Sequence, residues 1–353
     1  MQKMIRIGTR ESQLAVWQAT QVKDLLAQQG VDSELVYIRS EGDIDLKTPL
    51  YEMGVQGIFT RSLDIALLNH TIDIAVHSMK DVPTRLPAGI RQTAVLKRGP
   101  VHDLLVFKTM TMATADGQKN DRARPPAFLT QKDYIAKIAT SSIRRKAQWL
   151  HKYPAHQICN LRGNVNTRLK KLAESDWDGA IFAQAGLERI HLRPANSIVL
   201  DWMLPAPAQG AILVACREED DATDQACQPL NDEDTAFCTK IERDFLRTLL
   251  GGCSTPISAL AEIEDGEVYF SGHILSLDGS RKVEVEQILP IERSATMGRD
   301  AAEELLERGG KEIADEIRAA TGDTAESAMD GSGIAEGAPA TGGPSADESG
   351  PNN

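Results

Sequence analysis

The chain has 353 residues, of which 41% are hydrophobic and 25% are charged, and its formal net charge is −12. This composition is ordinary for a globular protein with two or three domains. No apolar run approaches the length of a membrane span and no signal-peptide pattern precedes the first strand, so we expect a cytoplasmic protein without a membrane partner.

The cysteines argue against two further classes of protein. Their number is odd and they contain no C-x-x-C pair, which disfavours a disulfide framework and a zinc site. The seven histidines do not fall into ligand spacings either, so we predict no metal. The five cysteines are Cys159, Cys216, Cys227, Cys238 and Cys253.

The net charge is distributed unevenly along the chain. Residues 321–353 contain six acids and no base, are rich in Gly, Ser, Ala and Pro, and show no periodicity, which predicts a disordered acidic tail. Residues 137–171 contain nine Lys or Arg and no Asp or Glu. An acidic protein with one strongly basic region is expected to bind an anionic ligand there.

The first half of the chain alternates apolar strands with amphipathic helices, which predicts a parallel sheet with helices on both faces. Strands are expected at 4–9, 33–40 and 72–78, and helices at 11–30 and 61–70. A second series of strand, turn and helix begins near residue 103 and continues through 134–153, 157–174 and 178–190. Residues 204–218 form another apolar strand, which need not belong to this second unit.

The style of the sequence changes after residue 220. A helix is expected at 232–250, followed by two alternating strands within 267–289 that are joined at Asp278-Gly279, a strong hairpin signal. One last helix is expected at 300–320. This third piece reads as a small α+β domain.

Polar residues recur where the predicted strands end. Helix N-termini at such strand ends present unpaired N–H groups to anions. One junction alone would indicate only a solvated arginine or an N-cap, but repetition at five junctions favours a polyanion site. The five junctions carry Arg10 and Ser12; Lys80 and Asp81; Thr140, Ser141, Ser142, Arg144 and Arg145; Arg162 and Arg168; and Arg189.

Nucleic acid is the alternative polyanion, but aromatic residues are 5% of the chain and do not interleave with these cations, so we expect no nucleic-acid partner. Asp81 is the exception among the cations. Its carboxylate is expected to stabilise a developing positive charge or to move a proton, or else to form a salt bridge or cap.

Cys253 lies in "LLGGCSTPIS", after two glycines and before a proline, which predicts an exposed turn. Taken alone, this pattern leaves a structural cysteine more common than a reactive one.

Together these residues resemble the porphobilinogen deaminase family. The resemblance runs from about residue 5 to 320 and rests on "IGTRES", "DIAVHSMKDVPT", "ATSSIRRKAQ", "NLRGNVNTRL", "AQAGLERI", "LPAPAQGA" and "GGCSTPI". It implies an α/β fold with two domains like type 2 periplasmic binding proteins and a small C-terminal α+β domain. The implied boundaries are 1–99 with 204–220 for domain 1, 100–203 for domain 2, and 221–320 for domain 3.

The resemblance also implies the chemistry. A dipyrromethane cofactor attached to Cys253 would serve as a primer, onto which four porphobilinogen molecules condense with loss of ammonia before hydrolysis releases hydroxymethylbilane. We therefore expect a monomeric transferase of tetrapyrrole biosynthesis, with Asp81 facing the pyrrole nitrogens as the catalytic residue and as a cofactor contact. The cofactor carboxylates would be held by Lys80, Thr140, Ser142, Arg144 and Arg145, and the substrate and chain by Arg10, Ser12, Arg162, Arg168 and Arg189.

Two other functions compete with this one. A passive anion-binding or sensor module could use the same fold, but it needs neither a carboxylate in its cleft nor an exposed thiol. A cysteine acyl transferase would need a histidine partner that the sequence does not place. The sequence departs from the family at Glu52 and Gln56, where lysines are usual, and in the insertion at 109–126.

Overall fold

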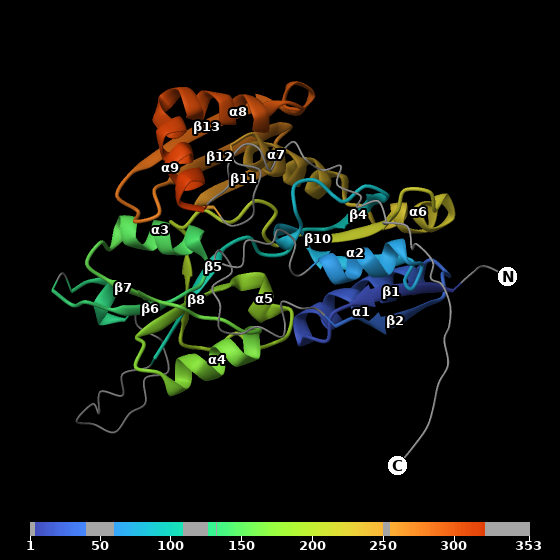
Figure 1. Cartoon of the computed structure of the whole chain (residues 1–353), viewed down its shortest axis with the longest axis horizontal. Helices are drawn as coiled ribbons and strands as arrows, with labels where there is room; N and C mark the ends of the chain where they lie inside the picture. Colours follow the sequence, from blue (N-terminus) through green and yellow to red (C-terminus); the bar gives the residue numbers. More distant parts are fainter. Residues whose placement is uncertain (1–3, 40–59, 109–125, 132, 250–254, 322–353) are drawn as a thin grey trace, which may run out of the picture.

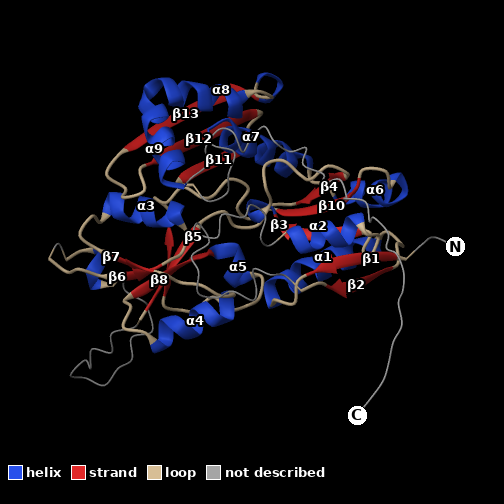
Figure 2. Cartoon of the chain, in the orientation of Figure 1, coloured by secondary structure: helices blue, strands red, loops and turns tan. Residues whose placement is uncertain are grey.

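The described part of the chain forms three separate β-sheets, and helices flank each of them (Figure 1, Figure 2). The computed structural model describes residues 4–39, 60–108, 126–131, 133–249 and 255–321. Glu52, Gln56, Cys253 and nearly all of the insertion and of the acidic tail lie outside the described residues.

The first sheet has the strand order β2-β1-β3-β10-β4. Its strands are β1 (Ile5–Thr9), β2 (Ser33–Tyr37), β3 (Ile74–Ser78), β4 (Ile90–Leu96) and β10 (Ile212–Arg217). Helices α1 (Gln13–Gln28), α2 (Arg61–Leu68) and α6 (Asp221–Cys227) accompany it. Because successive side chains of a strand point to opposite faces, β3 packs Ile74 with Val22 and Leu26 of α1, and Ala75 with Leu67 of α2.

The second sheet has the strand order β7-β6-β8-β5-β9. Its strands are β5 (Asp103–Phe107), β6 (Lys137–Ala139), β7 (Gln157–Cys159), β8 (Gly179–Ala183) and β9 (Ser197–Leu200). The helices are α3 (Ile143–Lys152), α4 (Val165–Glu174) and α5 (Gln184–Glu188). Leu105 packs with Trp149 of α3 on one face, and Leu104 packs with Leu172 of α4 on the other.

The prediction of parallel sheets was wrong in one respect, since both sheets are mixed. β10 runs antiparallel to β3 and β4, and β5 runs antiparallel to β8 and β9. Parallel neighbours need a crossover connection that carries the chain back to the same end of the sheet. β5 and β10 instead enter from linkers that pass between the two sheets, so they run against their neighbours.

The third sheet is antiparallel in the order β11-β12-β13, formed by β11 (Ile257–Glu264), β12 (Glu267–Leu275) and β13 (Lys282–Pro290). One face packs on α7 (Glu233–Leu249), α8 (Met297–Leu305) and α9 (Lys311–Thr321), with the rings of Phe245 and Phe270 5.2 Å apart. The α/β class with a small C-terminal α+β unit is thereby confirmed. The domain boundaries stay predictions.

Local predictions in the C-terminal unit were partly right. The hairpin at Asp278-Gly279 is confirmed, and Gly279 adopts a φ of 76° there. β11 was not predicted. The single helix expected at 300–320 is two helices joined by a π-helical turn over Leu306–Gly310, in which Gly309 has a φ of 104° that interrupts the helix.

Short helical turns complete the described elements. They are η3 (Met79–Asp81), η4 (Ala127–Leu129), η5 (Gln228–Leu230) and η6 (Ile291–Arg293). No helix in the described ranges is both long and apolar enough to span a membrane.

Two linkers, residues 97–102 and 201–211, connect the first two sheets, and they touch each other. The amide of Gly99 donates to the carbonyl of Gly210 at 3.0 Å. Gly210 has a φ of 88°, and a Cβ there would lie 2.6 Å from the Gly99 oxygen. Glycine is therefore required at this crossing.

Gly298 marks the closest approach of α7 and α8, since a Cβ at this position would lie 2.0 Å from the carbonyl oxygen of Ile241. We expect Gly298→Ala to lower the free energy of unfolding by about 1–3 kcal/mol, because the helices must separate. Urea unfolding measures the change. Arg299→Ala, on the exposed side of α8, should stay within about 0.5 kcal/mol of the original protein. An undiminished stability of Gly298→Ala would contradict this contact.

Candidate active site

A cleft of about 310 Å³ lies among the three units, and most of the predicted site residues line it. α7 and β11 contribute Leu246 and Ile257 to its wall, together with Thr255, which precedes β11. The predicted residues on the wall are Arg10, Ser12, Lys80, Asp81, Ser141, Ser142, Arg144, Arg145, Arg162 and Arg168. The structure thus brings four of the five predicted junctions to one cavity.

Three of the helices that begin at this cleft, α1, α3 and α4, have side-chain caps. The Ser12 hydroxyl accepts from the amide of Ala15 at 3.4 Å, and the Ser142 hydroxyl accepts from that of Arg145 at 3.4 Å. Asn164 caps α4 in the same way, 2.9 Å from the amide of Thr167. Ser12 and Ser142 are therefore N-caps that also line a cavity, and the partial positive charge of three helix starts adds to that of the arginines.

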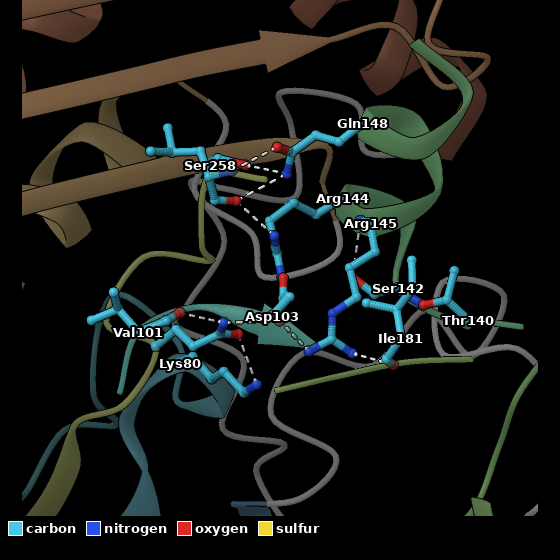
Figure 3. A network of polar contacts seen from close by, with 12 residues as sticks. Lys80, Val101, Asp103, Thr140, Ser142, Arg144, Arg145, Gln148, Ile181 and Ser258 are labelled. Carbon is cyan, nitrogen blue, oxygen red and sulfur yellow. Dashed lines mark hydrogen bonds and ion pairs between the residues drawn. The ribbon is translucent and has the colours of Figure 1, made fainter. Parts of the chain in front are cut away.

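Arg144 and Arg145 are held by a buried carboxylate that the sequence analysis missed (Figure 3). Arg144 Nη2 donates to Asp103 Oδ2 and Arg145 Nη2 donates to Asp103 Oδ1, both at 2.7 Å. Burial alone would raise the pKa of Asp103, but the two guanidinium groups lower it. An acid at the head of the apolar strand "DLLVF" was the available signal, because a buried charge must be paired.

Gln209 was also missed, and it connects the ammonium of Lys80 to the same carboxylate. Lys80 Nζ donates to Gln209 Oε1 at 3.1 Å, while Gln209 Nε2 donates to Asp103 Oδ1 at 2.9 Å. Desolvation, followed by repulsion from Arg145, lowers the pKa of Lys80 to about 8, against the attraction of Asp81. Lys80 is therefore a cation that an anionic ligand would stabilise.

Like Lys80, Arg168 is a cation of the cleft wall whose charged form is destabilised by burial. Its pKa is lowered to about 10 by desolvation and by Arg145 and Arg162. The Nε atoms of Arg145 and Arg168 are buried without a hydrogen-bond partner in the described part of the chain. Buried donors without acceptors are costly, so these nitrogens indicate a ligand with several anionic oxygens.

Asp81 is the one carboxylate among the described residues that line the cleft. It ends the turn η3, and the two carbonyls that follow this turn accept from Arg243 of α7, a residue that the sequence analysis did not identify. Arg243 Nη1 donates to Val82 O at 3.0 Å, and its Nη2 donates to Pro83 O at 2.6 Å. The position of Asp81 thus depends on the C-terminal unit as well as on β3.

Three predicted residues have other surroundings. Thr140 is buried, and its hydroxyl accepts from the amide of Ser142 at 3.2 Å, so it shapes the turn before α3. Arg189 donates to Gly210 O at 2.5 Å and lies 5.6 Å over the ring of Trp17, beside the linker. Cys253 lies outside the described residues, two positions before Thr255 on the cleft wall.

Glu242 of α7 fixes the C-terminal unit against the linkers. Its carboxylate is fully buried and accepts from Arg98 Nη1 at 2.6 Å and Nη2 at 2.9 Å. It also accepts from the amides of Ala208 at 2.6 Å and Ala261 at 2.8 Å. The C-terminal unit is thereby joined to both linkers.

The cleft wall carries only a few kinds of polar group among the described residues. In the described ranges no group of three or more His, Cys, Asp or Glu side chains is placed to hold a metal ion. Besides apolar side chains, the described wall carries guanidinium groups, one ammonium, hydroxyls, side-chain amides, helix starts and one carboxylate. It can bind several carboxylates at once and stabilise one cation near Asp81.

Fold and site together define a multidomain enzyme with a polyanion-binding cleft. The family model "porphobilinogen deaminase, dipyromethane cofactor binding domain" matches residues 5–225, and "porphobilinogen deaminase, C-terminal domain" matches residues 236–307. The chain belongs to the porphobilinogen deaminase family, whose members are transferases that act on porphobilinogen and use a dipyrromethane cofactor.

Two relatives named porphobilinogen deaminase support the same assignment. The chain is 40% identical to porphobilinogen deaminase of Syntrophotalea carbinolica over 88% of this chain and 94% of that protein. It is 40% identical to the chloroplastic porphobilinogen deaminase of Oryza sativa over 89% of this chain and 87% of that protein. Among solved structures, a periplasmic substrate-binding protein of an ABC transporter from Coxiella burnetii is 16% identical with a TM-score of 0.38, covering 64% of this chain and 91% of that one.

The wall fits the family's cofactor. A dipyrromethane carries an acetate and a propionate on each pyrrole, and the cleft offers the matching donors, including the buried Nε atoms of Arg145 and Arg168. Planar guanidinium groups suit carboxylates better than a compact ammonium does.

The lowered pKa of Lys80 makes a prediction for protein that cannot carry a cysteine-linked primer, such as a Cys253→Ser background. Because the unfolded chain retains a pKa near 10.5, it binds more protons than the folded protein between about pH 8 and 10.5, so stability contributed by Lys80 rises with pH. Lys80→Met should therefore be more stable at pH 7 by roughly 1–3 kcal/mol, and this difference should shrink as the pH reaches 10.

Urea unfolding at several pH values measures the difference. Lys146→Met, which removes an exposed lysine of α3, reports the effect of losing one surface charge. A stability difference for Lys80→Met that does not change with pH would contradict the desolvation of this ammonium.

Proposed function

We propose that this chain holds a dipyrromethane primer on Cys253 and extends it in the cationic cleft with porphobilinogen as its own substrate. One observation carries the proposal: a cleft walled by guanidinium groups also contains a single carboxylate, Asp81, among its described residues. A passive anion binder gains nothing from that carboxylate, whereas a reaction that passes through a cation requires it.

Attachment of the primer to Cys253 is supported by the residues on either side of this position. Leu246 precedes the cysteine and Thr255 follows it, and both line the cleft. Described residues on both sides of Cys253 in the sequence therefore reach the cleft, which supports attachment of the primer at this position. When bound, dipyrromethane supplies a nucleophilic pyrrole carbon at which chain growth starts.

One group of cations binds the carboxylates of the primer, and another binds those of the substrate and the growing chain. Lys80, Arg144 and Arg145 form a connected group around Asp103 and suit the fixed primer, with Thr140 and Ser142 shaping the turn beside them. The substrate and the growing chain fall to Arg10, Ser12, Arg162, Arg168 and Arg189. Each charge-assisted hydrogen bond contributes about 1.5–3 kcal/mol.

Asp81 acts on the charge that develops during each condensation. As the C–N bond of porphobilinogen breaks and ammonia leaves, positive charge spreads into the pyrrole ring and onto its N–H. The Asp81 carboxylate accepts a hydrogen bond from this N–H and stabilises the cation until the new C–C bond forms. The monomeric state, the cytoplasmic location and the lack of nucleic-acid and membrane partners stay predictions.

The intact mass of the denatured protein tests the attachment site. The original chain, after incubation with porphobilinogen, should carry two porphobilinogen units less their two ammonia molecules, and Cys253→Ser should carry none because it lacks the thiol. Cys159→Ser, at a partly buried cysteine of β7, serves as the control and should keep the adduct. An adduct on Cys253→Ser, or none on the original chain, would remove this assignment.

Asp81→Ala tests the catalytic role. We expect the primer to remain bound, since the cations that hold it are intact, while kcat for porphobilinogen falls by about 10²–10³-fold. Asp315→Ala, at an exposed carboxylate of α9, should leave kcat unchanged. Near-normal turnover by Asp81→Ala would show that its carboxylate does not act in the reaction.

A further inference from the structure

Asp103 lies behind the cleft wall and is fully buried, so it reaches a ligand only through its neighbours. Its two oxygens are divided: Oδ2 accepts from Arg144, and Oδ1 accepts from Arg145 and Gln209. One carboxylate thus sets the relative position of two guanidinium groups that belong to adjacent residues of α3.

Each of these arginines is fixed at a second nitrogen by a main-chain carbonyl. Arg144 Nη1 donates to Leu204 O at 2.7 Å, and Arg145 Nη1 donates to Ile181 O at 3.2 Å. A guanidinium group with two of its nitrogens held has little rotational freedom, so its remaining N–H groups point in set directions. Arg145 Nε is one of these, and it is buried without a partner among the described residues.

Repulsion between the guanidinium charges of Arg144 and Arg145 opposes their close placement. Arg144 and Arg145 are both only 5% exposed, and desolvation together with repulsion from Arg145 lowers the pKa of Arg144. Asp103 is the acid that opposes this lowering. Without its charge, two neighbouring buried cations would repel each other and turn apart before any ligand arrived.

Gln209 extends the arrangement to the other sheet. It lies on the returning linker, accepts from Lys80 next to β3, and donates to Val101 O at 2.7 Å and to Asp103 at 2.9 Å. The amide orientation follows from its neighbours, since an ammonium only donates and a carboxylate only accepts. Cations from both α/β units are therefore connected by hydrogen bonds to the Asp103 carboxylate (Figure 3).

We propose that Asp103 is a positioning residue for the dipyrromethane cofactor: it holds Lys80, Arg144 and Arg145 in the arrangement that receives the cofactor carboxylates. The inference rests on the proposed function, because it takes these three cations as the cofactor's binding groups. Asp103 itself touches neither cofactor nor substrate.

The first sheet offers a matched control. Asp73 is also fully buried and also pairs with two arginines, accepting from Arg6 Nε at 2.9 Å and from Arg217 Nη2 at 3.2 Å, but it lies away from the cleft wall. Asp103→Asn and Asp73→Asn thus remove the same charge from similar surroundings, and only the first disturbs the cleft.

The experiment compares the original chain, Asp103→Asn and Asp73→Asn after incubation with porphobilinogen, by intact mass for the fraction carrying the primer and by thermal unfolding for stability. Both variants should melt at lower temperature. The primer-bearing fraction of Asp103→Asn should fall by about tenfold or more, whereas that of Asp73→Asn should match the original chain. Equal primer fractions for Asp103→Asn and the original chain, or equal losses in the two variants, would overturn the inference.

Asp103→Glu keeps the test decisive where Asp103→Asn fails to fold. It retains the charge but extends the side chain by one methylene, which displaces both guanidinium heads. A folded Asp103→Glu protein with a reduced primer fraction supports positioning, and one with an unchanged fraction overturns it, because the charge alone would then suffice. A primer missing from the original chain would instead contradict the proposed function itself.

Discussion

Burial of positive charge is the constraint on which the site depends. The cleft must hold several arginines and a lysine away from water before any ligand is bound, and desolvation lowers the pKa of Lys80 to about 8 and that of Arg168 to about 10. Full compensation by acids would leave nothing for a ligand to neutralise. The protein compensates partly, with Asp103 and with main-chain carbonyls such as those of Leu204 and Ile181, and leaves the remaining donors to the ligand.

The same constraint explains the path of the chain. Both linkers pass behind the cleft, and they supply groups that a single sheet could not: the Val101 and Leu204 carbonyls and the Gln209 amide. Glu242 then joins these linkers to α7 and β11. The unit that supplies Leu246, Thr255 and Ile257 to the cleft wall is therefore anchored by the same linkers.

The cations could be predicted from sequence because each follows a strand end, and parallel strands bring their carboxyl ends to one edge. Their partners could not, since the interactions join distant residues: Arg144 with Asp103 across 41 positions, and Lys80 with Gln209 across 129. The direction of β10 was missed for the same reason. A strand that returns through a long linker carries no local sign of which way it runs.

Binding and chemistry make opposite demands on this cleft. Guanidinium groups that attract carboxylates also raise the free energy of any cation formed beside them. Under the proposed function, the carboxylates of the primer and substrate neutralise the arginines when they bind, and only then does the negative charge of Asp81 determine the local potential. A cleft without its primer would therefore both lack the nucleophile and oppose the loss of ammonia. Under the proposed function, the presence of the primer is therefore an electrostatic requirement of the reaction as well as a chemical one.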